Sequence, residues 1–421
     1  MLRFTLSPTE DIHIGNLKVA LLNYIVAKQR GEKFLVRIED TDVKKNIDAN
    51  DREILEILTL FGIEFDEVVY QSHNQKFHQQ LAMKLLMDKN AYNCFCSSEH
   101  LNMKKQEAKD SKKPYRYDEA CKNLPDELVI DNENPFSVRI SKPKDDLKFT
   151  DLIKGDMSFK TENIDDFVIL RVDKTPTYNF ASALDDMLSD ISLVIREDNY
   201  ISNTHKETAI RDAIGYDKTI EYAHLPIILN NASSVKWLLE EGFLPEAIAN
   251  YLLLIGFKAP QEIFSIEDAI EWYDITKVSK SPVKFDMTEL KNINKSHILA
   301  MDSLKLASLI GHRSSEIGDL AKLYTEEAST INELKEKIEK IFTKKECDEF
   351  AKEFETLKLV IKDAPHFNEY DEFEKYLMEK SGLKGKQLFE PLRVLLTGAK
   401  SGPNVSDMYR HIKNYIKEVA K

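Results

Sequence analysis

Residues 2–16 read LRFTLSPTEDIHIGN, and this stretch decides the fold of the first part of the chain. Leu2 to Leu6 is compatible with a β-strand, which would end at the turn signal Ser7-Pro8-Thr9. Apolar residues then recur with the 3.6-residue period of a helix as far as Gly31, a residue type that often ends helices. A second strand candidate, Phe34 to Ile38, follows. Strand, helix and strand with short connections predict a parallel crossover in a nucleotide-binding type of sheet.

The pattern of helix and strand signals changes after these first elements. A second helix is expected from about Asp48 to Phe61, and a Lys-rich helix near residues 103–113. Strand character returns between Phe167 and Ile195. We therefore expect an α/β domain that is interrupted by an inserted domain. After Val235 the apolar spacing is helical almost everywhere, so the remainder is expected to be all-helical.

Composition excludes several classes of protein. The 421 residues are 42% hydrophobic and 31% charged, which is typical of a globular chain of about three domains. Apolar runs of the roughly 18–20 residues that span a bilayer are absent from the sequence, and its first residues do not resemble a secretory signal. Four cysteines are too few for a disulfide-built fold. We expect a cytoplasmic protein that does not enter membranes; its net charge of −13 still leaves room for a local basic face.

Two motifs suggest a ligand site. His13 and Gly15 precede the first predicted helix, whose N-terminus suits a phosphate; the alternative is an ordinary helix cap with a turn glycine. Glu39 follows the second predicted strand, at the edge where open α/β sheets bind ligands, and could pair with an ammonium group. Arg3 and Arg196 could each clamp a carboxylate in bidentate fashion. The alternative for these charges is a solvated loop.

A third feature is a cysteine cluster. Cys94 and Cys96 are followed by Tyr117 and Cys121, which could together make a structural tetrahedral zinc site. The Cys-x-Cys spacing is tighter than the usual Cys-x-x-Cys, and the fourth ligand would have to be Tyr117. Free buried cysteines are the alternative.

Taken in order, the motifs resemble those of class I aminoacyl-tRNA synthetases, and among them the bacterial glutamyl-tRNA synthetases. The opening motif resembles the family signature, which usually ends His-Ile-Gly-His. The likeness spans nearly the whole chain and is weaker across the helical end. The other matching segments are Arg37 to Asp42, Pro176 to Phe180, Asp185-Asp186, Tyr222 to Pro226, Leu238 to Tyr251, Val278 to Pro282, Phe285-Asp286 and Gly385 to Gly402.

The resemblance implies a Rossmann-type parallel-sheet catalytic domain with an inserted α/β domain that binds the acceptor stem, followed by an all-helical region that binds the anticodon. The expected boundaries are 1–72 and 176–230 for the two catalytic halves, 73–175 for the insertion, 231–300 for a helical stem-contact region and 301–421 for the anticodon-binding domain. A monomer is expected.

The resemblance also implies a reaction. L-Glutamate would attack ATP with Mg²⁺ present, and the glutamyl group of the adenylate would pass to the 2′-hydroxyl of the terminal adenosine of tRNA-Glu, tRNA-Gln or both. His13 and Asn16 would be catalytic, and His13, Gly15 and Asn16 would hold ATP. The residues expected to bind glutamate are Arg3, Thr5, Ser7, Glu39, Tyr178, Ser182 and Arg196.

Several departures from the family pattern bear on this expectation. Thr5-Leu6 replaces the usual Ala-Pro, and Ser182 stands where Asn is frequent. The second family signature, a Lys-x-Ser-Lys-Arg loop, should lie between Leu229 and Val235 but is absent there. Lys277 to Ser281 has similar letters but lies about fifty residues too late. We expect the natural protein to carry about ten further residues between Leu229 and Val235. The alternative is a non-catalytic paralogue that binds tRNA or nucleotide.

Overall fold

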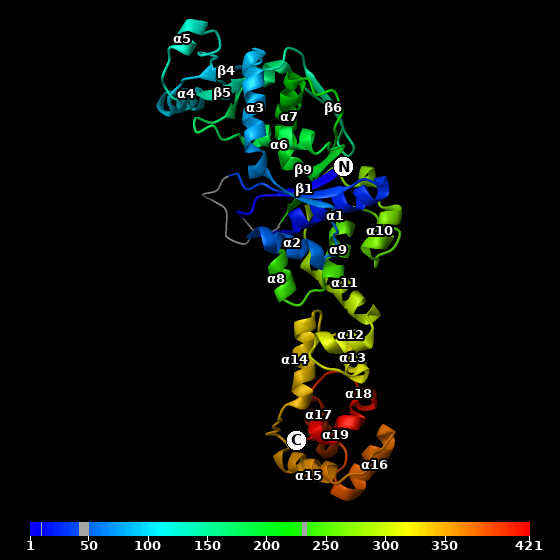
Figure 1. Ribbon diagram of the computed structural model, residues 1–421. Coiled ribbons are helices and arrows are strands. Elements are labelled where there is room, and N and C mark those ends of the chain that lie inside the picture. Colours follow the sequence, from blue (N-terminus) through cyan, green and yellow to red (C-terminus); the bar gives the residue numbers. More distant parts are fainter. Residues whose placement is uncertain (10, 42–49, 230–233) are drawn as a thin grey trace. The chain divides into compact units, whose positions relative to one another are not determined.

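The computed structural model describes residues 1–9, 11–41, 50–229 and 234–421, and it divides into two compact units. The first unit holds residues 1–235, 252–260 and 264–285, and the second holds the rest. Figure 1 shows sheets with helices in the first unit and helices in the second. The predicted combination of an α/β part and a helical C-terminal part is therefore confirmed.

A seven-stranded sheet is the framework of the first unit, with the strand order β3-β2-β1-β9-β10-β6-β7. Its strands β1 and β2 pair in parallel, with Leu2 opposite Phe34 and Leu6 opposite Ile38, which confirms the predicted crossover. Only β6 and β7 pair antiparallel among the described strands of this sheet. The strands are β1 (Leu2–Leu6), β2 (Phe34–Ile38), β3 (Glu67–Tyr70), β6 (Leu147–Asp151), β7 (Gly155–Phe159), β9 (Leu193–Glu197) and β10 (Glu221–Leu225).

Helix α1 (Ile14–Arg30) crosses from β1 to β2 and buries its apolar side, including Leu17, Leu21 and Ile25. Gly31 ends the helix with φ 62°, a left-handed conformation that glycine adopts without a steric cost, so the predicted end is confirmed. Helix α7 (Ile201–Ile214) contacts β6, α6 (Tyr178–Leu188) packs on α7, and α10 (Ile266–Trp272) packs on α1; α2 (Asn50–Leu60) lies between β2 and β3 in the chain.

A smaller antiparallel sheet has the order β4-β5-β8, with β4 (Ala91–Cys94), β5 (Ser137–Ile140) and β8 (Phe167–Leu170). It lies near α3 (Gln75–Met87), α4 (Ser98–Asp110) and α5 (Asp126–Ile130) (Figure 1). The predicted Lys-rich helix is thus present, although it begins earlier. The chain leaves this sheet after β5, forms β6 and β7 of the large sheet, and returns as β8. The range 73–175 expected for the insertion therefore contributes to both sheets.

The rest of the first unit includes a short parallel pair, β11 (Ile228–Leu229) and β12 (Val283–Lys284). The segment Lys277 to Ser281 leads into β12, where its Val278 is buried. The 3₁₀ turns of this unit are η1 (Gln71–Asn74), η2 (Thr161–Asn163), η3 (Asp198–Tyr200) and η4 (Ile275–Lys277). Helices α8 (Val235–Glu240) and α9 (Pro245–Leu254) follow β11 in the chain, and most of their residues belong to the second unit.

The second unit is built from helices. Leu334, Ile338 and Ile341 are fully buried along one helix, as their spacing predicts. Across the described residues of both units, none of the helices is long and apolar enough to cross a membrane. Besides α8 and most of α9, the helices of the second unit are α11 (Met287–Ala300), α12 (Ser303–Leu309), α13 (Ser315–Lys322), α14 (Ile331–Phe342), α15 (Ala351–Lys362), α16 (Tyr370–Ser381), α17 (Lys386–Thr397), α18 (Val405–Ile412), η5 (Lys413–Tyr415) and α19 (Ile416–Val419).

Candidate active site

A cavity of about 450 Å³ opens at the carboxyl ends of β1, β2 and β9. This is the edge where parallel sheets bind ligands. Arg3, His13 and Arg196 all line it, so these three side chains converge on one site. The residues expected from the sequence that line the cavity are Arg3, Thr5, Ser7, His13, Asn16, Glu39, Tyr178 and Arg196.

His13 caps the N-terminus of α1. Its Nδ1 accepts hydrogen bonds from the backbone amides of Gly15 (3.1 Å) and Asn16 (3.3 Å), and the Asn16 side chain accepts one from the His13 amide (3.2 Å). Because Nδ1 is an acceptor, a neutral His13 carries its proton on Nε2. The ring therefore presents an N–H donor, beside the positive end of a helix dipole, at a place that suits a phosphate group.

Gly15 lies beneath the side chains of His13 and Glu197 instead of lining the cavity. A methyl group at Gly15 would collide with the Glu197 carboxylate and the His13 ring. The position therefore needs glycine, as the sequence suggested, because side chains approach the backbone closely there.

Charged residues form the opposite part of the cavity. Nε of Arg3 donates to Oδ1 of Asp186 (3.1 Å), and Nη1 of Arg37 lies 2.8 Å from the same oxygen. Although burial opposes ionisation, these two arginines hold the pKa of Asp186 down to about 2. Within the described part of the chain, no hydrogen bond reaches the terminal nitrogens of Arg3, so both can face a carboxylate in the cavity.

Glu39 offers a negative group to the same cavity. Its Oε1 is buried without a hydrogen-bond partner among the described residues. Burial raises the pKa of Glu39, while Arg37 and Arg3 oppose that rise. An unpaired carboxylate oxygen at a cavity wall is suited to accept an ammonium group.

Ser182 and Gly15 are the expected ligand-binding residues that do not line the cavity. Ser182 is buried on α6, where it accepts a 3.4 Å hydrogen bond from Nη2 of Arg37. Its place in the structure is thus behind the cavity wall, next to Arg37.

Sequence reasoning missed part of the lining. Gln71 follows β3, and its amide donates to Asp185 of α6; Arg171 follows β8. Neither lies in a motif, and only the tertiary structure brings them to the cavity. The further lining residues are Phe4, Leu6, Thr9, Val19, Thr41, Gln71, Arg171, Ile195, Glu197, Asn199 and Tyr200.

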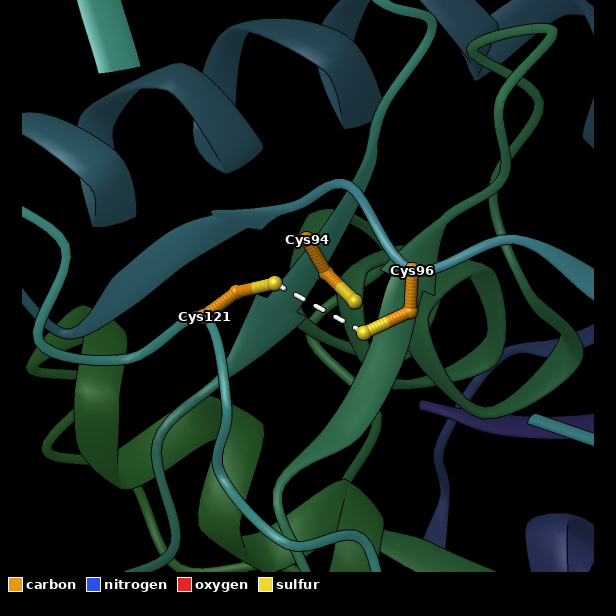
Figure 2. Close-up of side chains that lie close together, drawn as sticks. All are labelled: Cys94, Cys96 and Cys121. Carbon is orange, nitrogen blue, oxygen red and sulfur yellow. Dashed lines mark hydrogen bonds between the residues drawn. The ribbon is translucent and has the colours of Figure 1, made fainter. Parts of the chain in front are cut away.

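The cysteine cluster lies beside the smaller sheet. The sulfur atoms of Cys94, Cys96 and Cys121 all lie within 4.8 Å of one another, and Figure 2 shows them pointing toward a common centre. The Tyr117 hydroxyl lies 3.5 Å from the sulfurs of Cys94 and Cys96. These four donors therefore fit one tetrahedral ion.

Arg139 favours a thiolate in this cluster. Its Nε donates to the Cys94 sulfur at 3.3 Å. Burial raises the pKa of the Cys94 thiol, but hydrogen bonds from Tyr117 and Arg139 outweigh burial and lower that pKa to about 7. The thiolate form, which binds metals, is therefore accessible near neutral pH.

The expected position of the second signature falls on residues 230–233, which lie outside the described residues. Lys277 to Ser281 does not contribute to the described lining of the cavity. The structure gives this segment a place at the entry to β12, as described above.

Comparison with protein families identifies the class. Residues 1–292 match the family "tRNA synthetases class I (E and Q), catalytic domain", and residues 299–412 match the family "Anticodon binding domain". Together these families cover most of the chain. The chain therefore belongs to the class I aminoacyl-tRNA synthetases, in the branch for glutamate and glutamine.

Curated relatives within this branch are glutamate–tRNA ligases. The chain is 56% identical to "Glutamate--tRNA ligase 2" of Sulfurimonas denitrificans and 52% identical to "Glutamate--tRNA ligase 1" of Nitratiruptor sp., covering 100% of both chains in each case. It is similar in fold to a glutamate tRNA ligase of Elizabethkingia meningosepticum, solved in complex with its amino acid, with a TM-score of 0.83 and 24% identity over 99% of this chain and 97% of that chain.

The lengths of these alignments bear on the second signature. The first alignment spans 432 positions, and this chain has 421 residues, so 11 positions (432 − 421) have no counterpart here. The second alignment spans 430 positions, which leaves 9 (430 − 421). Both differences are close to the ten residues expected to be missing.

Proposed function

We infer that the chain is a glutamate–tRNA ligase: it forms glutamyl-adenylate from L-glutamate and ATP, and it transfers the glutamyl group to the 2′-hydroxyl at the 3′ end of tRNA. The observation that carries this function is one cavity that joins a phosphate-binding helix end to arginines and an unpaired carboxylate. The full-length relatives support it and do not favour a non-catalytic paralogue.

Each end of glutamate has a partner of opposite charge. Arg3 offers two free terminal nitrogens to a carboxylate, and Glu39 offers an oxygen to the ammonium group. Thr5, Ser7 and Tyr178 add hydroxyl groups to the same wall. A substrate held at both ends has its remaining carboxylate aimed at the ATP α-phosphate, which is catalysis by alignment.

ATP would bind at the N-terminus of α1. The Nε2–H of His13 would donate to phosphate oxygens, and Asn16 lines the same end of the cavity. Mg²⁺ would be bound mainly by the phosphates of ATP, and Glu197, whose carboxylate lies against Gly15, offers a further oxygen ligand. No covalent enzyme intermediate is needed for either step.

The helical C-terminal domain would bind the anticodon arm of tRNA-Glu, tRNA-Gln or both, and the part around the smaller sheet would bind the acceptor stem. We also propose that the enzyme acts as a cytoplasmic monomer. Its four cysteines form no disulfide, which fits a reducing compartment.

A structural zinc ion would be held by Cys94, Cys96, Cys121 and Tyr117. The close approach of the three sulfurs and the phenol oxygen supports this proposal, as does the lowered pKa of Cys94. The ion would fasten the segment around Cys121 to the end of β4, far from the cavity chemistry.

The test is charging of purified tRNA isoacceptors with labelled glutamate, together with glutamate-dependent ATP–pyrophosphate exchange in the presence of tRNA. We expect charging of tRNA-Glu, tRNA-Gln or both, and no charging with glutamine. Protein that carries its complete second signature and still shows neither reaction would refute the proposal.

A further inference from the structure

Arg196 is held by its neighbours on almost every side. Its Nη1 and Nη2 donate to the two carboxylate oxygens of Glu207 at 2.8 and 2.9 Å, and Nη2 also donates to Thr204 at 2.7 Å. Its Nε donates to Nε2 of His224 at 3.2 Å. A guanidinium group has five N–H bonds, so these contacts leave one for a substrate. The expected bidentate clamp by Arg196 is therefore not available in this arrangement.

His224 on β10 sets the orientation of that guanidinium group. The ring is fully buried, and its Nδ1 lies 2.6 Å from Oδ2 of Asp151. The same oxygen accepts the His224 backbone amide, and Oδ1 of Asp151 accepts the amides of Ile153 and Lys154. An ionised carboxylate surrounded by N–H donors requires the proton of His224 to sit on Nδ1. Nε2 then carries a lone pair, which accepts the hydrogen bond that Nε of Arg196 donates.

The opposite tautomer would break this arrangement. A proton on Nε2 would point at the N–H of Arg196, and Nδ1 would face the Asp151 carboxylate without a proton between them. Thr204 reinforces the observed state, because its hydroxyl lies 3.1 Å from Nε2 and accepts from Arg196 Nη2. Thus Asp151, through His224, decides how Arg196 is held.

We propose that Asp151 and His224 are positioning residues for glutamate recognition: they fix Arg196 so that it offers a single N–H to a substrate carboxylate, while Arg3 provides the bidentate contact. This proposal rests on the proposed function. Asp151 lies at the end of β6, so a residue from the range expected for the acceptor-binding insertion shapes the amino-acid site.

Three variants separate the two hydrogen bonds of the ring. His224→Asn keeps a donor near Nδ1 and loses the acceptor for Arg196, whereas His224→Gln can place an oxygen near Nε2 and loses the donor to Asp151. Asp151→Asn is isosteric and can keep its two turn amides, but its NH₂ group would favour a His224 tautomer with the proton on Nε2. The matched control is His205→Asn, because the half-buried His205 stacks on Phe159, and no hydrogen bond joins it to Arg196 in the described part of the chain.

The measurement is charging of tRNA with varied glutamate and with varied ATP. We expect the KM for glutamate to rise by roughly 10- to 100-fold in His224→Asn and in Asp151→Asn, with a smaller rise in His224→Gln. The KM for ATP should change less than about threefold in all of them, and His205→Asn should match the unchanged enzyme.

The outcomes are distinguishable. An enzyme that carries its complete second signature and unchanged Asp151 and His224, but cannot charge tRNA with glutamate, contradicts the proposed function. If the enzyme is functional and its variants keep the original KM for glutamate, the positioning role alone is overturned. The same holds if the variants lower kcat and raise the KM values for glutamate and for ATP to the same extent. If the variants do not fold, nitrogen NMR of ¹⁵N-histidine-labelled enzyme decides: one ring with its proton on Nδ1, unchanged between pH 6 and 8, is expected, and the absence of such a ring overturns the proposal.

Discussion

Nε of Arg3 donates a 3.1 Å hydrogen bond to Oδ1 of Asp186, and this buried pair fixes the arginine that faces the cavity. The same oxygen also forms an ion pair with Arg37. One carboxylate on α6 therefore serves two strands of the sheet, which makes it a sensitive position for both stability and binding.

Asp186→Asn should lower the free energy of unfolding by about 3–5 kcal/mol, because it leaves two buried arginines short of a counter-charge. Urea unfolding measures this change. The control is Asp190→Asn, which removes an exposed ion pair with Lys218 and should cost far less, because water already screens that pair. Equal losses in the two variants would contradict the account.

Glutamate binding should weaken in acid. The raised pKa of Glu39 means that its carboxylate is lost at a higher pH than that of an ordinary Glu, while the carboxylates of free glutamate stay ionised. The KM for glutamate should therefore rise as the pH falls from 8 toward 5.5. In Glu39→Gln it should be roughly 10- to 100-fold higher at pH 8 and nearly independent of pH. A variant with the original pH profile would rule out Glu39 as the ammonium partner.

Lys18 should make stability depend on pH. It is buried in α1, where its Nζ donates to the Ile255 carbonyl (2.6 Å), and burial lowers its pKa to about 7. Between that value and the ordinary pKa of about 10.4, the unfolded chain binds more protons than the folded one, so stability from this group rises with pH. Lys18→Met should remove that rise, which is on the order of a few kcal/mol.

Unfolding at several pH values between 7 and 10 measures the Lys18 effect. The exposed Lys28 on the same helix is the control, because Lys28→Met leaves the buried amine in place. The same pH slope in the Lys18 variant and the unchanged protein would show that Lys18 is not titrating in this range.

The cysteine cluster should bind zinc, so the protein should contain about one zinc ion per chain. Elemental analysis of protein expressed with zinc measures this content. Cys121→Ser should lose the ion and lower the melting temperature, because the segment that carries Cys121 would no longer be tied to β4. Cys347→Ser, in the second unit, should keep both. If the full-length protein contains no zinc and chelators do not change its melting temperature, the cysteines are free and do not form a metal site.

The natural protein should be longer than 421 residues by about ten, inserted between Leu229 and Val235. The family signature is expected there, and the alignment lengths fit the insertion. Its lysine would stabilise charge on the leaving pyrophosphate, so protein without the segment should charge tRNA far more slowly. Gene sequencing and intact mass decide; 421 contiguous residues would disprove the expectation.

Local patterns predicted the first βαβ unit well. The alternation of Leu2 to Leu6, the helical period and Gly31 each depend on nearby residues, so they can be read from the chain alone. Glu39 and Arg196 could be assigned to the cavity because they come at the carboxyl ends of predicted strands, where parallel sheets bind ligands. Arg3 lies near the start of β1, so its place in the cavity does not follow from the strand pattern.

Long-range pairing could not be predicted in the same way. β6 meets β10 through a single parallel register pair, Asp151 with Tyr222; the alternation of its five residues indicates a strand but does not show which strand it pairs with. Nothing local shows that Asp151 would reach His224, or that Arg196 would already be occupied by Glu207. Such contacts depend on tertiary packing, which overrides local preference.

The return of the chain to the large sheet between β5 and β8 limits how the protein can be trimmed or recombined. Cutting out residues 73–175 as one continuous block would also delete the hairpin at residues 147–159, and with it Asp151, the partner of His224. Removing or exchanging the smaller sheet while keeping the large sheet intact would need two separate changes, one on either side of that hairpin.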